Sequence, residues 1–288
     1  MSGGPTLVAG ATGRQGGAVA RHLLAAGARV RAMTRRPSSP AAQRLAATGA
    51  ELVQADLDDP SSLARAADGA HAVFSVQDFW QAGAAGEVRQ GTALARAAAE
   101  AGVALVVQST MATPRDAPGA PHVAHFESKR TVERALADLG LPHALVGTVY
   151  FMDNVLDADQ GGRWTIPTLA GSLAPHTELD VVAVDDVGAV AAAMLLDPGR
   201  FVGARADVVG DRLTVAAMRA AYRRASGRRA RRWRLPAWAL RRLNAEFAEQ
   251  LAWQNAAGFA PDAELTRELR PELVTFEAFV RAHGVTNL

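Results

Sequence analysis

The sequence of 288 residues contains no cysteine. This absence excludes disulfide bonds, zinc sites built on cysteine and a thiol nucleophile. Long apolar runs are also missing, and no stretch approaches the roughly 18 residues that a membrane-spanning helix needs. The first ten residues, MSGGPTLVAG, lack the basic segment of a secretory signal. We therefore expect a cytoplasmic protein that does not bind membranes.

Lysine and tyrosine are scarce. Lysine and arginine together number 31, but the only lysine is Lys129, in the stretch HFESKR (125–130), and there are two tyrosines. The formal net charge of +2 gives little reason to expect a nucleic acid as partner. Arginine is bulkier than lysine and spreads its charge over a plane. A single lysine therefore indicates a position that needs a compact ammonium group.

Short apolar segments alternate with alanine-rich segments of helical periodicity through the first half of the chain. This alternation is typical of parallel strands whose connecting helices cover both faces of one sheet. The predicted strands are residues 6–11, 28–34, 51–56, 71–76, 103–109 and 143–149. The expected fold class is therefore α/β, with a doubly wound parallel sheet.

After about residue 150 the alternation weakens. The Gly- and Pro-rich stretch 161–175 is expected to be irregular. A helix is predicted over 186–199, capped at its start by Asp186, and Thr214 is predicted to cap a second helix over 215–225. We interpret the second half as a smaller lobe that folds against the first.

A glycine motif follows the first predicted strand. The stretch GATGRQG has the spacing G-x-x-G-x-x-G and opens a predicted helix, which is the context that a dinucleotide-binding loop requires. Glycines allow a tight turn and close approach of the backbone, and the helix N-terminus directs N–H groups at a diphosphate. The candidate binding residues are Gly10, Ala11, Thr12, Gly13, Arg14, Gln15 and Gly16.

The second predicted strand ends in Thr34, Arg35 and Arg36. An NAD enzyme usually has an acidic residue there, which binds the ribose 2′-hydroxyl. Arginine can instead pair with a 2′-phosphate through its planar fork. We therefore predict NADP(H) as the cofactor, with two solvated arginines as the alternative interpretation. After the third strand, Asp56 and Leu57 are expected beside the adenine.

Several segments together resemble the NmrA-like family of atypical short-chain dehydrogenases/reductases. They are residues 9–35, 49–59, 72–80, 87–110, 125–129, 150–156 and 268–284. The resemblance implies an extended Rossmann fold with NADP(H) on the carboxyl edge of the sheet. We expect an NADP(H)-binding Rossmann domain at residues 1–155 and a smaller α+β lobe at 156–288 for substrate or partner. Segments near 181–197 are expected to return to the first domain.

The resemblance also implies roles for individual residues. The glycine loop would hold the diphosphate, and Arg35 the 2′-phosphate. The cofactor would be lined after the fourth strand by Gln77, Asp78 and Phe79. The nicotinamide side would be reached by Arg89, Lys129, Tyr150, Phe151 and Asn154.

Lys129 coincides with the catalytic lysine of short-chain dehydrogenases. In that family a tyrosine precedes the lysine by four residues and protonates the substrate oxygen, but here His125 has that place. Ser109 lies where the helper serine is expected. His125 has an ordinary pKa near 6.5 and is a candidate proton donor, with Tyr150 as competitor and a structural histidine as the alternative.

Other features are weaker indications. His122 and His125 lie near Glu127, but no further ligand cluster is present and no metal site is expected. The basic stretch 222–243 carries Trp233 and Trp238, which we interpret as surface arginines with packed or cleft-lining tryptophans rather than a nucleic-acid site. The candidates for an apolar substrate wall are Phe79, Trp80 and Trp164.

Two hypotheses of function remain at this point. The first is an NADPH-dependent oxidoreductase that reduces a small apolar carbonyl compound, quinone or enone in a cleft between the lobes. Lys129 would fix the cofactor and His125 or Tyr150 would supply the proton. The alternative is a catalytically silent NADP(H) redox sensor that regulates a protein partner, which the missing tyrosine favours. Either protein is expected to be a monomer or homodimer.

Overall fold

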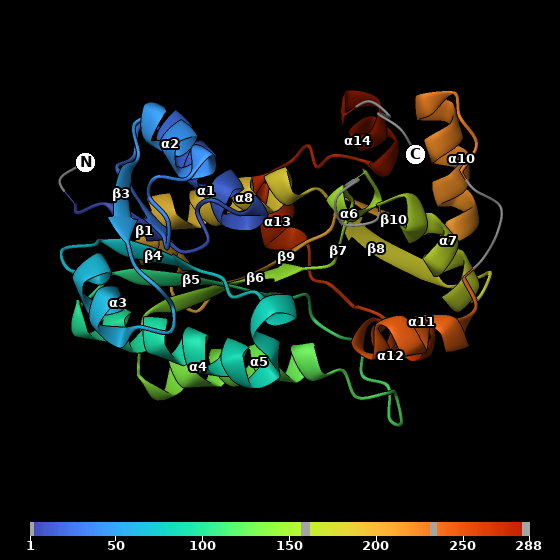
Figure 1. The fold of residues 1–288 in the computed structure, drawn as a ribbon, viewed down its shortest axis with the longest axis horizontal. Coiled ribbons are helices and arrows are strands. Elements are labelled where there is room, and N and C mark those ends of the chain that lie inside the picture. Colours follow the sequence, from blue (N-terminus) through green and yellow to red (C-terminus); the bar gives the residue numbers. More distant parts are fainter. Residues whose placement is uncertain (1–2, 157–161, 231–234, 284–288) are drawn as a thin grey trace.

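The computed structural model describes residues 3–156, 162–230 and 235–283 (Figure 1). Its main sheet has seven strands in the order β3-β2-β1-β4-β5-β6-β9, and every neighbouring pair is parallel. The strands are β1 (Thr6–Val8), β2 (Val30–Thr34), β3 (Glu51–Gln54), β4 (Ala72–Ser75), β5 (Leu105–Met111), β6 (His143–Thr148) and β9 (Arg205–Val208). The expected α/β class is confirmed, because this strand order is that of the Rossmann fold.

Helices cover both faces of the main sheet (Figure 1). One face carries α1 (Arg14–Ala25), α2 (Pro40–Ala47), α8 (Val184–Leu196) and α13 (Glu264–Leu269), and the short α9 (Pro198–Phe201) follows α8. The other face carries α3 (Pro60–Ala67), α4 (Phe79–Glu100) and α5 (Ala124–Asp138). Successive side chains of a strand point to opposite faces. Val8 and Phe74 accordingly pack in one apolar cluster, and Leu7 in the other.

The smaller lobe has its own sheet and core. Its strands, in the order β10-β8-β7, are β10 (Asp211–Thr214), β8 (Glu178–Val182) and β7 (Tyr150–Phe151). Its helices are α6 (Asp153–Leu156), α7 (Gly162–Ser172), α10 (Val215–Ser226), α11 (Ala237–Leu243), α12 (Ala245–Ala256) and α14 (Phe276–His283). Met152, Leu169 and Phe276 are fully buried in its apolar cluster. The division at residue 155 stays a prediction.

Two segments of the second half pack with the first half. Helix α8 lies along α1, where a Cβ on Gly188 would come within 2.5 Å of the Cβ of Ala18. Strand β9 pairs with β6 at the edge of the main sheet, a return that the sequence pattern did not predict. The chain therefore crosses between the two lobes more than once.

The expected irregular structure at 161–175 is wrong, because α7 forms across most of it and contains Pro167. Ile166 and Leu169 are buried in the core of the smaller lobe. Apolar burial stabilises a helix more than local propensity does, and it offsets the hydrogen bond that the proline cannot donate.

One of the two predicted helix caps is confirmed. The Oγ1 of Thr214 accepts the Ala217 N–H at 3.2 Å at the start of α10. Asp186 does not cap α8, which begins after Ala183. Its buried carboxylate instead accepts the Nε–H of Arg270 at 3.1 Å. The acidic side chain therefore fixes a distant segment of the chain rather than its own helix.

Parallel strands place all their carboxyl ends on one edge of the sheet. The loops that follow β1, β2, β3 and β4 therefore share that edge, and they carry the predicted cofactor-binding residues of the glycine loop together with Arg35, Asp56, Leu57, Gln77 and Asp78. Among the described residues, no helix has the length and apolar character needed to cross a membrane.

Candidate functional site

The glycine loop joins β1 to the N-terminus of α1. Gly10 has a φ of +61°, and its carbonyl accepts the Gly13 N–H at 2.8 Å, which closes a tight turn. A Cβ on Gly16 would lie 2.4 Å from the carbonyl oxygens of Ala9 and Gly10. Gly13 begins α1 without a side-chain cap, so the N–H groups of the first turn keep their donor capacity. The loop is a backbone cradle that suits a diphosphate.

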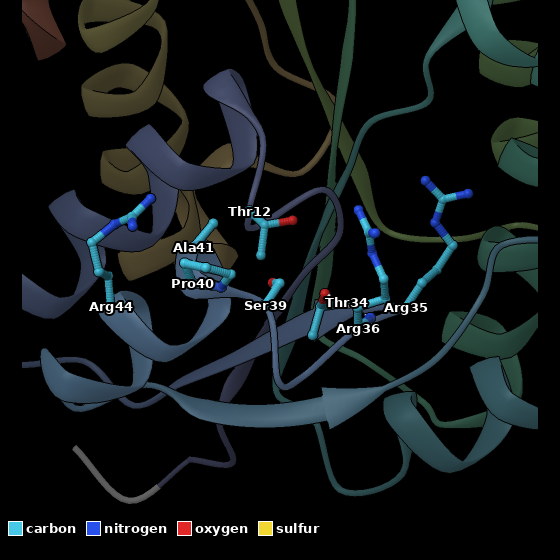
Figure 2. Close-up of a pocket in the computed structure, with 8 residues that line it drawn as sticks. All are labelled: Thr12, Thr34, Arg35, Arg36, Ser39, Pro40, Ala41 and Arg44. Atoms are coloured by element: carbon cyan, nitrogen blue, oxygen red, sulfur yellow. Dashed lines mark hydrogen bonds between the residues drawn. The ribbon is translucent and has the colours of Figure 1, made fainter.

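A pocket of about 410 Å³ lies beside this loop. Figure 2 shows Arg35 and Arg36 projecting from the loop after β2 on one side of Thr12, and Arg44 of α2 on the other. The lining residues are Thr12, Thr34, Arg35, Arg36, Ser39, Pro40, Ala41 and Arg44. The sequence pattern indicates Arg35 and Arg36 but not Arg44. Arg44 lies in α2, the helix after this loop, and belongs to no motif.

The three arginines of the pocket form no ion pair within the described structure, although the charge of Arg35 contributes to lowering the pKa of Asp58. Among the described residues, no ion pair involves the guanidinium group of Arg35, Arg36 or Arg44. The Oγ of Ser39 accepts the Ala42 N–H at 3.3 Å and so fixes the start of α2. The pocket is thus strongly positive and suits a dianionic group such as a phosphate.

The loop after β3 carries Asp56 and Leu57, both half-buried, and then the exposed Asp58. Asp58 Oδ1 accepts hydrogen bonds from the Nε and Nη2 of Arg89, at 2.9 and 2.8 Å. Hydrogen bonds from Gln90 and Arg89 lower the pKa of Asp58. Arg89 was expected on the nicotinamide side, but the structure places its guanidinium at this loop.

The residues after β4 divide between the interior and the surface. Gln77 is buried and its Nε2 donates to Ser75 Oγ at 2.9 Å, while Asp78 accepts the Trp80 N–H at 3.0 Å and begins α4. The aromatic ring of Phe79 lies edge-on to that of Trp80, with 5.4 Å between centroids. Trp80 is 57% exposed. Only Phe79 and Trp80 therefore offer an apolar surface here.

Lys129 is paired with an acidic residue that the sequence pattern did not identify. Its Nζ lies 2.8 Å from Glu87 Oε1, and Glu87 is fully buried. The hydroxyl of Ser128 donates to the other carboxylate oxygen. Glu87 and Arg89 project from different sides of α4, which is why Arg89 does not join Lys129. The lone lysine is thus the counter-ion of a buried carboxylate, whatever else it contacts.

His125 is held by a residue of the smaller lobe. Its Nδ1 lies 2.9 Å from Glu246 Oε1, and its backbone N–H donates to the same oxygen at 2.9 Å. Burial lowers the pKa of His125, Glu246 opposes that shift and Lys129 adds to it. Among the described residues, Nε2 has no hydrogen-bond partner. The effect of the Lys129 charge on His125 agrees with their spacing of four residues on one helix, which places both side chains on the same face of α5.

Tyr150 and its neighbours lie where the main sheet leads into the smaller lobe. Burial raises the pKa of Tyr150 to about 12, and its ring stacks on that of Phe247 with 6.3 Å between centroids. Asn154 Oδ1 accepts a hydrogen bond from Arg14 of the glycine loop at 3.0 Å. Phe151 packs against the core of the main sheet. A phenol with so high a pKa holds its proton firmly.

The remaining sequence candidates are placed as follows. Ser109 is buried and its hydroxyl donates to Gln15 Oε1 at 2.7 Å. Glu127 pairs with Arg130 at 2.6 Å, and the described part of the chain has no group of three or more acidic or histidine residues that could hold a metal ion. Trp238 is exposed on α11, whereas Trp233 and the side chain of Trp164 lie outside the described residues.

A profile of the NmrA-like family matches residues 5–267. The chain therefore belongs to the NmrA-like family, as its sequence motifs predicted. Among curated relatives, it is 31% identical over 220 residues to the NmrA-like family domain-containing oxidoreductase ptmS of Penicillium ochrochloron. The match covers 67% of this chain and 64% of that protein, so the chain spans less than two thirds of this relative's length.

Two solved structures share the fold. One is NmrA, a negative transcriptional regulator, in complex with NADP, with 24% identity, coverage of 96% of this chain and 94% of that chain, and a TM-score of 0.74. The other is an NADPH-dependent quinone oxidoreductase from Escherichia coli complexed with NADPH, with 22% identity, coverage of 96% and 99%, and a TM-score of 0.77.

Proposed function

We propose that this protein binds NADP(H) along the carboxyl edge of the main sheet and is an NADPH-dependent oxidoreductase. Its substrate would be a small, largely apolar carbonyl compound, quinone or enone. The observation that carries the proposal is the positive pocket, in which Arg35, Arg36 and Arg44 lie beside the glycine loop and form no ion pair with a described residue. A 2′-phosphate would supply the missing negative charge.

We assign each part of such a cofactor to residues along this edge of the sheet. The glycine loop would hold the diphosphate on backbone N–H groups, and the half-buried Asp56 and Leu57 would border the adenine. Arg14 and Asn154, already joined to each other, would lie between the diphosphate and the reactive end. Lys129 would face the nicotinamide ribose while Glu87 neutralises its charge.

Reduced nicotinamide, when bound, supplies a hydride to the substrate carbon. His125 in its imidazolium form would give the Nε2 proton to the substrate oxygen, so that hydride and proton together complete the reduction. Phe79 and Trp80 would contact the apolar part of the substrate. Tyr150, with its pKa raised to about 12, is the weaker proton donor of the two.

The relatives support this assignment by analogy. The similar protein ptmS is an oxidoreductase of the same family, and a protein with the same fold reduces quinones with NADPH. We expect a cytoplasmic monomer or homodimer that takes its substrate between the lobes, and these points stay predictions. The contact between Glu246 of α12 and His125 of α5 supports a substrate position at the junction of the lobes.

A turnover assay tests the proposal directly. Purified protein is incubated with NADPH and a panel of quinones, enones and aldehydes, and the loss of nicotinamide absorbance is followed with product analysis. We expect NADPH to be consumed in proportion to the reduced product, and NADH to be a poor replacement. If no acceptor of the three classes is reduced, the oxidoreductase assignment fails.

A second candidate function is a redox sensor that binds NADP(H) without turnover and regulates a protein partner. Two observations favour it: histidine replaces the tyrosine at position 125, and Lys129 already pairs with Glu87. A negative transcriptional regulator also has the same fold. A sensor should bind NADPH and NADP⁺ with clearly different affinities in calorimetric titrations and reduce no acceptor, and equal affinities would count against it.

A further inference from the structure

The junction of the two lobes holds a histidine whose ring is fixed by a single carboxylate oxygen. Glu246 Oε1 is 2.9 Å from both the backbone nitrogen and the Nδ1 of His125. The two side chains are only 12% and 17% exposed. The hydrogen bond from the His125 backbone N–H holds Glu246 Oε1 at the first turn of α5. The imidazole ring of His125, which contacts the same oxygen, therefore has little freedom to rotate.

This contact determines which ring nitrogen carries the hydrogen. A carboxylate can only accept a hydrogen bond, so the Nδ1 of His125 must be the donor. In the neutral imidazole the second nitrogen, Nε2, is then an acceptor. Neutral His125 therefore cannot serve as a hydrogen-bond donor at Nε2, and it could give a proton from that nitrogen only in its imidazolium form.

The surroundings keep the ring neutral. Three charged groups face His125 from the elements around it: Glu246 of α12, Lys129 of α5 and Glu87 of α4. Burial and the charge of Lys129 lower the pKa of His125 and outweigh the two carboxylates. At neutral pH the free protein thus presents a bare Nε2 lone pair with no hydrogen-bond partner among residues 3–156, 162–230 and 235–283.

Aromatic rings surround this acceptor. The ring of His125 lies 5.3 Å from that of Phe79 and 5.8 Å from that of Trp80, centroid to centroid. Trp80 is more than half exposed, and the backbone breaks from helical geometry at Gly83, with a φ of +68°. An unpaired acceptor beside an exposed aromatic side chain suits a flat ligand that carries one hydroxyl donor.

We infer that Glu246 is a positioning residue that fixes His125 in the Nδ1–H tautomer. The Nε2 of this tautomer then recognises a hydroxylated aromatic ligand of the phenol or hydroquinone class. The ligand hydroxyl donates to Nε2 and its ring packs on Phe79 and Trp80. The inference rests on the proposed function in one respect, since it names the class of compound that the same site would hold.

The tautomer is tested first. Nitrogen-15 NMR of labelled protein identifies which ring nitrogen of His125 is protonated, with His125→Phe used to assign the signals. We expect protonated Nδ1 and bare Nε2 in wild type. Glu246→Gln keeps an acceptor oxygen and should keep this tautomer, whereas Glu246→Leu should shift the population toward Nε2–H. A wild-type spectrum with protonated Nε2 would overturn the inference.

The ligand class is tested with two matched probes, 2-naphthol and 2-methoxynaphthalene, titrated with and without NADP⁺ and followed by NMR. We expect wild type and Glu246→Gln to bind the naphthol about five- to tenfold more tightly than the ether. His125→Phe and Glu246→Leu should lose this preference. Equal binding of both probes by wild type refutes the ligand class. An absence of NADPH turnover refutes only the oxidoreductase, because neither measurement needs turnover.

Discussion

At the level of single residues, two partnerships join side chains that are far apart in the sequence. Lys129 pairs with Glu87, and His125 pairs with Glu246. Each partnership gives a structural reason for a residue that the sequence motifs had linked to catalysis. The two roles can be separated, because a structural role affects stability and a functional role affects binding or rate.

Lys129→Met should destabilise the fold by about 3–5 kcal/mol, since it leaves the buried Glu87 carboxylate without a counter-ion. The double variant Lys129→Met/Glu87→Leu removes both charges and should recover most of that stability in urea denaturation. Its affinity for NADPH should nevertheless stay below that of wild type, because the ammonium group of Lys129 is missing. If the double variant binds NADPH like wild type, Lys129 is only a counter-ion.

His125 gives a prediction about pH. Burial and Lys129 lower its pKa below the ordinary 6.5, so the imidazolium form is present only in more acidic solution than for a free histidine. Reduction needs that form, and the rate of NADPH-dependent reduction should therefore fall as pH rises through a midpoint below 6.5. Glu246→Gln removes a carboxylate that raises this pKa and should move the midpoint lower. A rate that rises with pH would contradict His125 as proton donor.

At the scale of elements, the glycine loop and the first turn of α1 make one unit. A Cβ on Gly13 would lie 3.2 Å from the Gly10 carbonyl oxygen, a tight but tolerable contact, whereas one on Gly16 would lie 2.4 Å from two carbonyl oxygens. A side chain at position 13 therefore needs a backbone shift of only a few tenths of an ångström, whereas one at position 16 needs a much larger rearrangement.

Gly13→Val should consequently leave a folded protein that binds NADPH at least tenfold more weakly, because the side chain fills the cradle meant for the diphosphate. Circular dichroism checks the fold and calorimetry the affinity. Gly199→Val is the matched control, since its Cβ has no neighbour within 4 Å. Normal NADPH binding by Gly13→Val would show that the loop does not hold the diphosphate.

The elements also show what the sequence could and could not predict. Most strands of the first half were predicted because buried parallel strands need continuous apolar runs, while the half-exposed β3 was predicted from its place in the alternation. Helix α7 was not, because contacts made by Ile166 and Leu169 in the folded lobe outweigh its glycines and Pro167. Thr214 was found from local chemistry, while the distant partner of Asp186 left no local signal.

The residues of the candidate site likewise divide into those that the sequence indicates locally and those that only the folded structure brings together. The glycine loop and Arg35 belong to short motifs that a sequence displays directly. Glu87, Glu246 and Arg44 belong to none, because they reach the site only through the packing of α4, α12 and α2. Glu246 is 121 residues from His125 in the chain, and no spacing rule connects them.

At the scale of the whole molecule, the proposed NADP(H) site runs along the carboxyl edge of the main sheet. The pocket of Arg35 and Arg44 lies at one end, and Lys129 and His125 lie at the other, where the smaller lobe contributes Glu246. In this proposal one surface recognises the cofactor and a separate one, to which both lobes contribute, carries out the reaction. We propose that the first of these surfaces selects NADP(H) over NAD(H).

Calorimetric titration of NADPH and NADH into wild type and three arginine variants tests that claim most directly. Wild type should bind NADPH much more tightly than NADH. Arg35→Ala and Arg44→Ala should each lose about 1.5–3 kcal/mol of NADPH binding, the worth of a hydrogen bond to a charged group, with NADH affinity unchanged. Arg96→Ala, an exposed arginine on α4 away from the pocket, should match wild type. Equal wild-type affinities for the two cofactors, or NADPH binding unaffected by both pocket variants, would show that this pocket does not select NADP(H).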